Sequence, residues 1–206
     1  HATSQGGGLN VARDGLKMTR GTISGCSARS GGGVRVNEPP QNVRPFATLM
    51  DVLVTECRAT GEKDDDKGGG GILVQRGAVL VMSGGSIRDC AAHSLGGGLS
   101  VWDSASQVRL SGLALQGCTA AISYGCMHIK DGDVSLVDVS FDECGVENMC
   151  SSAYAIRQFL GTLRAERVRV GRPNPNYEFP QGCGASAVGL LGISKWTDST
   201  ISDCSG

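Results

Sequence analysis

Apolar and polar residues alternate in short runs along most of this chain, and glycine or serine separates one run from the next. Residues 96–120 show it best: Leu99 and Val101 alternate with Ser100, and Val108 begins the next run. Alternation with a period of two, rich in β-branched residues, predicts short strands that bury one face. No stretch keeps a helical period, so the chain is predicted to be all-β.

Residues 96–120 are one unit of a repeat that runs through the whole chain. A unit opens on a glycine run such as Gly96–Gly98 and closes on an aliphatic-x-x-Cys segment such as Leu115–Cys118. The third residue of each opening falls at positions 8, 33, 71, 98, 126, 153 and 184. A spacing of about 25–38 residues is typical of solenoids. We therefore expect a single right-handed parallel β-helix of about seven coils, with three short strands per coil.

The β-helix is predicted to fill residues 1–206 as one domain, a section of a longer array. Flanking β-helix coils or capping domains are expected partners, because an uncapped solenoid end exposes strand edges and apolar core. Insertions at 37–46, 60–67 and 173–181 lengthen corners between strands. Such loops either bind ligands or are tolerated surface variation.

Charge and hydropathy exclude two classes of partner. The net charge is -1, so nothing draws the chain as a whole to nucleic acid or to an anionic membrane. No apolar run approaches the roughly 18–20 residues that cross a bilayer, so no membrane span is predicted. Glycine is abundant, but without the Gly-X-Y period of collagen.

Nine cysteines are many for a reducing compartment and favour an extracellular protein. Five occupy one repeat position on successive coils: Cys26, Cys57, Cys90, Cys118 and Cys144. The sequence leaves their oxidation state open, and a ladder of buried thiols is favoured over strained bridges between stacked coils. Three others lie off this ladder and are the disulfide candidates: Cys126, Cys150 and Cys183.

The repeat resembles the β-helical passenger repeats of polymorphic outer-membrane and autotransporter-type surface proteins. Their Gly-Gly-Ala-aliphatic motif is matched here by Gly96-Gly97-Gly98-Leu99, and their Phe-x-x-Asn motif by Ile87-Arg88-Asp89-Cys90, with Cys in place of Asn. The resemblance covers nearly the whole chain and implies surface display and adhesion. More distantly the coil looks like the pectin-lyase-type β-helix, whose members include polysaccharide lyases and hydrolases.

The outward positions of the first strand in each unit carry bases, amides and one tryptophan, and no carboxylate. The candidate ligand-binding residues on this face are Arg35, Asn37, Gln75, Trp102, His128, Lys130 and Arg157. Cations suit uronate or sulfate groups, and an indole suits the apolar face of a sugar. We therefore expect an extracellular or cell-surface structural and adhesive module that binds acidic polysaccharide or other surface proteins. The alternative is an ordinary solvated sheet face.

A polysaccharide lyase or glycoside hydrolase is the alternative function. Asp103 and Asp131 fall at equivalent places on adjacent coils, where two carboxylates about 5 Å apart suit a retaining glycosidase. Lys130 or Arg157 could instead be the base of an elimination reaction, with a cation on the two carboxylates. Asp is also common in turns, and Asp131-Gly132 looks like one. The favoured hypothesis, a non-catalytic binding module, therefore assigns no catalytic residue.

No cofactor is expected, with calcium as the one alternative. An acidic run offers the oxygen ligands that calcium prefers. Its candidate ligands are Glu62, Asp64, Asp65 and Asp66. A flexible acidic loop accounts for the same residues.

Overall fold

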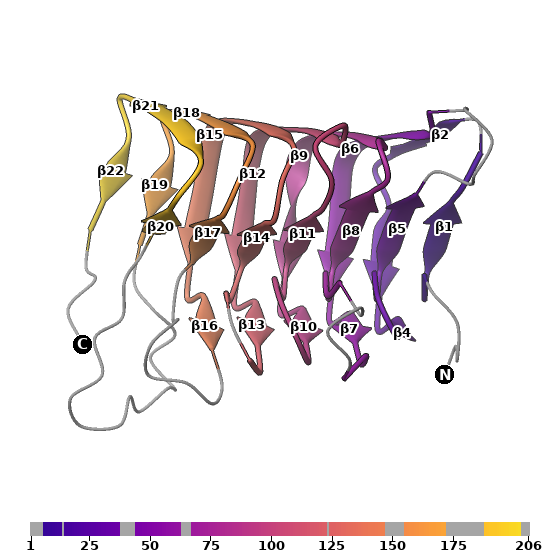
Figure 1. Ribbon diagram of the computed structural model, residues 1–206. Helices are drawn as coiled ribbons and strands as arrows, with labels where there is room; N and C mark the ends of the chain where they lie inside the picture. The colour runs from indigo at the N-terminus through magenta and orange to yellow at the C-terminus, as the bar shows by residue number, and fades with distance from the viewer. Residues whose placement is uncertain are drawn as a thin grey trace.

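The structure is a computed structural model of the 206-residue chain, and it describes residues 6–13, 15–37, 44–62, 67–122, 124–146, 155–171 and 188–202. These residues form strands and loops without any helix. All strand pairs are parallel and join successive coils (Figure 1). The predicted all-β parallel solenoid is confirmed.

Three parallel sheets run along the rod. The first consists of β1 (Leu9–Val11), β5 (Val34–Asn37), β8 (Ile72–Gln75), β11 (Leu99–Val101), β14 (Met127–Ile129), β17 (Ile156–Gln158) and β20 (Val188–Leu190). The second consists of β2 (Gly15–Thr19), β3 (Thr22–Ser24), β6 (Phe46–Thr55), β9 (Val79–Arg88), β12 (Gln107–Gln116), β15 (Asp133–Asp142), β18 (Thr162–Glu166), β19 (Arg169–Val170), β21 (Ile193–Thr197) and β22 (Thr200–Ile201). The third consists of β4 (Ser27–Ala28), β7 (Arg58–Ala59), β10 (Ala91–Ala92), β13 (Thr119–Ala120) and β16 (Gly145–Val146).

The number of coils depends on which sheet is counted. The first sheet has seven strands, but the third has five within the described residues. About five turns therefore contain all three sheets, slightly fewer than the seven coils that the glycine runs predict.

The division of each coil into strands differs from the expectation of three short strands. In the four middle coils, the second and third predicted strands form one continuous ten-residue strand with a bend. Residues in the left-handed region make the bend, such as Gly112 (φ 60°) and Asp138 (φ 54°). The strand keeps pairing with its neighbours on both sides of the bend. The third sheet instead comes from the dipeptides that follow the repeated cysteines.

The core is a column of aliphatic side chains enclosed by the three sheets. The inward positions predicted from the alternation are buried, including Leu99, Val101, Val108 and Leu115. Because equivalent residues stack in register, Val108 lies between Leu80 and Val134. The period of two therefore identified the core-facing side chains of these strands correctly.

The glycine runs form a ladder of their own at the corner before the first sheet. Gly71 N donates to Gly97 O at 2.9 Å, and Gly33 N donates to Gly70 O at 3.1 Å. A Cβ on Gly97 would lie 2.0 Å from the carbonyl oxygen of Thr119 in the same turn. The repeat needs glycine here because two backbone segments approach too closely for any side chain.

Four of the repeated cysteines are free, and one is not. Cys57, Cys90 and Cys118 are buried free thiols, and Cys26 is half-buried. A hydrogen bond with Cys90, together with burial, raises the pKa of Cys57, so the thiol stays protonated and packs as a small apolar group.

Cys144 is the exception to the predicted thiol ladder. It forms a disulfide with Cys126, with a Cα–Cα distance of 5.3 Å. The other two disulfide candidates, Cys150 and Cys183, lie outside the described residues. Cys126 was one of three cysteines expected to pair among themselves, but its partner is a residue that was expected to be a free thiol. The connection from β13 to β14 brings Cys126 beside the end of β15, where a repeat spacing cannot show it.

No helix among the described residues is both long and apolar enough to cross a membrane.

Candidate ligand-binding face

The parallel register of the first sheet aligns the predicted binding residues in rows along the rod. Ser100 of β11 pairs with His128 of β14, and His128 pairs with Arg157 of β17. Near the N-terminal end, Asn37 of β5 pairs with Gln75 of β8. The expectation that these residues share the outward side of one sheet is therefore met.

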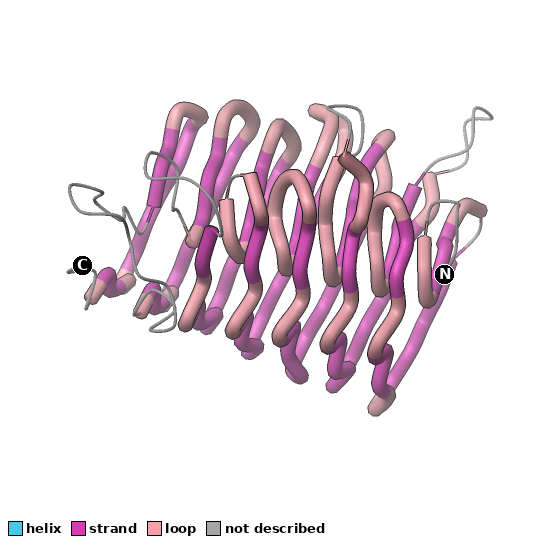
Figure 2. The backbone as a smooth tube through the Cα atoms, turned by 90° about the horizontal axis from the view of Figure 1, so that it is seen from below, coloured by secondary structure: helices cyan, strands magenta, loops and turns pink. Residues whose placement is uncertain are grey.

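This side of the sheet is not the solvated surface that the sequence predicts. Arg35, Asn37, Gln75 and His128 are each at most 9% exposed. The segments that return from the third sheet lie against it: a Cβ on Gly31 would touch Arg35 Cβ at 2.9 Å. These connecting loops repeat from coil to coil along the rod (Figure 2). The first sheet is thus covered on both faces, and most of the predicted binding face is an inner layer.

An aromatic–cation cluster lies where this layer opens toward solvent, on the coils of β11, β14 and β17 and with Lys67 from the connection before β8. Its members are Lys67, Trp102, Tyr124, His128, Lys130, Arg157 and Phe159. His128 is buried, Lys130 is exposed and the others are half-buried. Four of the seven predicted ligand-binding residues are brought together here: Trp102, His128, Lys130 and Arg157.

The cations of the cluster lie over aromatic rings. Lys130 Nζ is 5.5 Å from the centroid of the Trp102 ring and 5.8 Å from that of Phe159. The guanidinium of Arg157 is 4.8 Å from the Phe159 centroid. Lys67 Nζ approaches Trp102 at 5.1 Å. These separations are within the range of cation–π attraction, which fixes the charges without neutralising them.

Hydrogen bonds hold the indole of Trp102 in one orientation. Its Nε1 donates to Ser100 Oγ at 2.8 Å and to the carbonyl oxygen of Lys67 at 3.0 Å. The His128 ring packs against its edge with centroids 5.5 Å apart, and Tyr124 stacks on His128 at 5.2 Å. The half-buried ring is therefore positioned before any ligand arrives, which lowers the entropic cost of binding.

Ser100 and His128 form a pair that superficially suits nucleophilic catalysis. Ser100 Oγ is 3.3 Å from His128 Nδ1. Burial, and then the positive charges of Lys130 and Arg157, lower the pKa of His128 to about 3. An imidazole this weakly basic is a poor general base at neutral pH, and the serine is fully buried. The pair therefore supports the Trp102 ring and does not form a catalytic site.

The lowered pKa of His128 makes stability depend on pH. An unfolded histidine has a pKa of about 6.5, so below that pH the unfolded chain binds a proton that the folded chain excludes. We expect the free energy of unfolding to fall by up to about 1.4 kcal/mol per pH unit from this residue as pH drops from 6.5 toward 3. Urea unfolding at several pH values measures it.

His128→Gln should remove this part of the pH dependence, whereas the exposed His93→Gln should retain it. Equal pH dependence in the wild type and His128→Gln would show that His128 titrates normally in the folded protein.

Three members of the cluster were missed from the sequence. Phe159 could have been found, because it lies two residues after Arg157 and so on the same side of the chain. Lys67 and Tyr124 come from the connecting loops, which have no periodicity to place them. In the structure, Lys67 contacts the Trp102 ring and Tyr124 stacks on His128.

The two aspartates proposed as a catalytic pair are engaged in turns. Asp103 has a φ of 75°, and its Oδ2 accepts a hydrogen bond from Arg76 N at 2.7 Å. Asp131 Oδ1 accepts from Gly132 N at 2.7 Å. The local contact of Asp131 is typical of a turn, and the carbonyl oxygen of Asp103 closes a turn by accepting from Ser106 N at 3.0 Å, whereas its carboxylate bonds to the neighbouring coil. These contacts agree with the turn alternative for Asp103 and Asp131.

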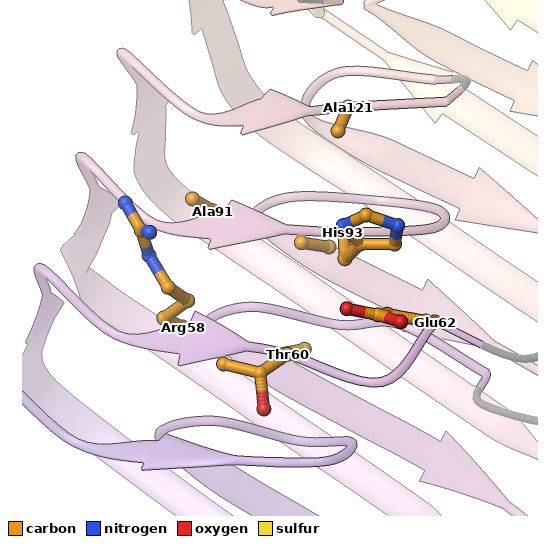
Figure 3. Close-up of a pocket in the computed structure, with 8 residues that line it drawn as sticks. Arg58, Thr60, Glu62, Ala91, His93 and Ala121 are labelled. Carbon is orange, nitrogen blue, oxygen red and sulfur yellow. The ribbon is translucent and has the colours of Figure 1, made fainter.

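A hollow of about 220 Å³ lies on the third sheet, and none of its lining residues belongs to the cluster. Alanines such as Ala91 and Ala121 make part of its lining, with Arg58, Glu62 and His93 around them (Figure 3). Of the candidate calcium ligands, only Glu62 is described, since Asp64, Asp65 and Asp66 lie outside the described residues. Within the described part of the chain, no three acidic, histidine or cysteine side chains gather as a metal site.

Comparisons with models of protein families, with curated proteins and with solved structures gave no match.

Proposed function

We propose that this β-solenoid is a non-catalytic structural module of the cell surface or extracellular space that binds acidic polysaccharide at the aromatic–cation cluster. The observation that carries the proposal is the set of cations held over positioned aromatic rings. The ion pairs of the described residues do not include Lys67 or Lys130. Their positive charge is therefore available to an anionic ligand.

The arrangement of the cluster suits a linear polymer. Trp102, Lys130 and Phe159 follow β11, β14 and β17, so the rod supplies one of them per coil. Stacked coils advance by about 4.8 Å, close to the length of one extended sugar unit. A chain running along the rod would meet an aromatic face or a cation at each step. Uronate or sulfate groups would pair with the cations, and the rings would contact apolar sugar faces.

Two further observations support the proposed location. The Cys126–Cys144 disulfide is typical of an oxidising compartment. The Gly-Gly-Gly-aliphatic and aliphatic-x-x-Cys motifs resemble the repeats of autotransporter-type passenger domains, which are displayed on surfaces. We propose the same kind of display here, with the rod as a rigid support for the binding cluster.

Size-exclusion chromatography of the protein with a panel of polysaccharides tests this function. Polyuronate and sulfated polymers should co-elute with the protein at low salt without becoming shorter. A neutral glucan of similar length is the control and should elute separately. Co-elution should weaken as salt increases, because the cations bind the anionic groups. Shortened polymer would replace the proposal with an enzyme, and separate elution of every polymer would remove the proposed ligand.

A further inference from the structure

Arg35 of β5 is a buried cation that has no ion-pair partner among the residues that the structure describes. It is 5% exposed. Its Nε is sealed from solvent and has no hydrogen-bond partner. A guanidinium carries five donors and cannot discard its charge by deprotonation at ordinary pH, so this arrangement is costly as it stands.

Two buried amides lie beside Arg35 on the same side of the sheet. Asn37 is two residues further along β5, and its Oδ1 is also buried without a partner. The two ends of an asparagine amide exchange by rotation, so this position offers a donor equally well. Gln75 pairs with Asn37 in the neighbouring strand and is 3% exposed. Three buried side chains that can donate hydrogen bonds thus lie on the same side of two neighbouring strands.

The charge around this position is positive. Besides burial, the charge of Arg76 lowers the pKa of Arg35 to about 10. The carboxylate of Asp103 accepts its hydrogen bond from the backbone of Arg76 and is not paired with Arg35. A buried guanidinium normally has a carboxylate, phosphate or sulfate as its counter-charge. The described residues do not supply one to Arg35.

We propose that Arg35, Asn37 and Gln75 bind a small oxyanion group: a sulfate, a phosphate or a carboxylate. Arg35 supplies the charge and a planar fork of donors, and the two amides complete the shell. The anion is either free or a side group of a bound glycan. This site lies on β5 and β8 and shares no residue with the aromatic–cation cluster, so the inference does not depend on the proposed function.

Thermal unfolding in sulfate and in chloride at matched ionic strength tests the site. Sulfate should raise the Tm of the wild type in a saturable way at millimolar concentration, because a ligand that binds only the folded state stabilises it. Phosphate and acetate follow as alternative free ligands, and an oligouronate and a sulfated oligosaccharide as glycan ligands. Arg35→Met should abolish the saturable rise. Arg109→Met, which changes an exposed arginine of β12, is the matched control and should retain it.

Arg35→Met has a second, independent signature. Without oxyanions its Tm should equal or exceed that of the wild type, because an apolar side chain of similar length removes an uncompensated buried charge. A Tm that rises equally with every anion in both proteins reports general salting-out and overturns the site. A saturable rise in Tm with the oligosaccharides alone identifies the bound anion as a side group of a glycan. Saturation by sulfate or phosphate identifies a free anion, and it should persist in the Trp102→Ala/Lys130→Ala variant.

Discussion

Gly97→Ala should destabilise the solenoid by at least about 3 kcal/mol, because the new Cβ has no space. It would lie 2.0 Å from the carbonyl oxygen of Thr119 and 2.6 Å from its backbone nitrogen. Both atoms belong to a backbone segment that is hydrogen-bonded to the neighbouring coil, with Thr119 N donating to Cys90 O at 2.9 Å. The segment that contains Thr119 therefore cannot move aside without breaking its hydrogen bonds to the neighbouring coil. Urea unfolding followed by circular dichroism measures the loss.

Gly112→Ala is the matched control for this prediction. Gly112 has a φ of 60°, but a Cβ there would meet nothing within 4 Å. Its cost should be that of a left-handed backbone alone, about 1–2 kcal/mol. If Gly97→Ala costs no more than Gly112→Ala, the close approach of the two backbones at the glycine corner is wrong.

Replacing Trp102 and Lys130 together by alanine should weaken binding of a polyuronate roughly 10- to 100-fold. A positioned aromatic face and a cation each contribute about 1 kcal/mol, and about 1.4 kcal/mol corresponds to a tenfold change in Kd. The two residues are coupled, since Lys130 lies over the Trp102 ring. Isothermal titration calorimetry with an oligouronate at low salt measures the effect.

Two control variants separate binding from folding in that experiment. Lys195→Ala removes an exposed lysine on β21 of the second sheet and should leave the affinity unchanged. Trp102→Phe retains an aromatic face but removes the indole donor to Ser100, so it should bind more tightly than the double variant. Equal affinity of the wild type and a folded double variant would place the ligand elsewhere on the rod.

The sequence predicted the faces of the strands better than their ends. Alternation identified Leu99 and Val101 as inward-facing, because a pleated strand must place every second side chain on one side. It did not predict that residues 107–116 form one strand. A left-handed residue such as Gly112 bends the strand while its neighbours keep pairing, and a bend has the same sequence signature as a strand end.

The sequence predicted which residues share one side of the first sheet, but not that most of them are buried. The repeat register correctly placed Ser100, His128 and Arg157 in one row. Their cover comes from connecting loops, whose conformation follows from long-range packing and has no local period. The same loops supply Tyr124 to the cluster and Cys126 to the disulfide with Cys144. Sequence periodicity describes the regular coil, whereas the site is built where irregular segments meet it.

The most direct test of ligand binding at the aromatic–cation cluster is a fluorescence titration of the Trp196→Phe variant with an oligouronate. The chain has two tryptophans, so Trp102 alone reports in this variant. Trp196 has a buried Nε1 without a hydrogen-bond partner, and phenylalanine replaces it without losing a bond. If acidic polysaccharide binds at the aromatic–cation cluster, Trp102 emission should change in a saturable way with the same Kd as that found by calorimetry. Binding by calorimetry with unchanged Trp102 emission would contradict binding at this cluster.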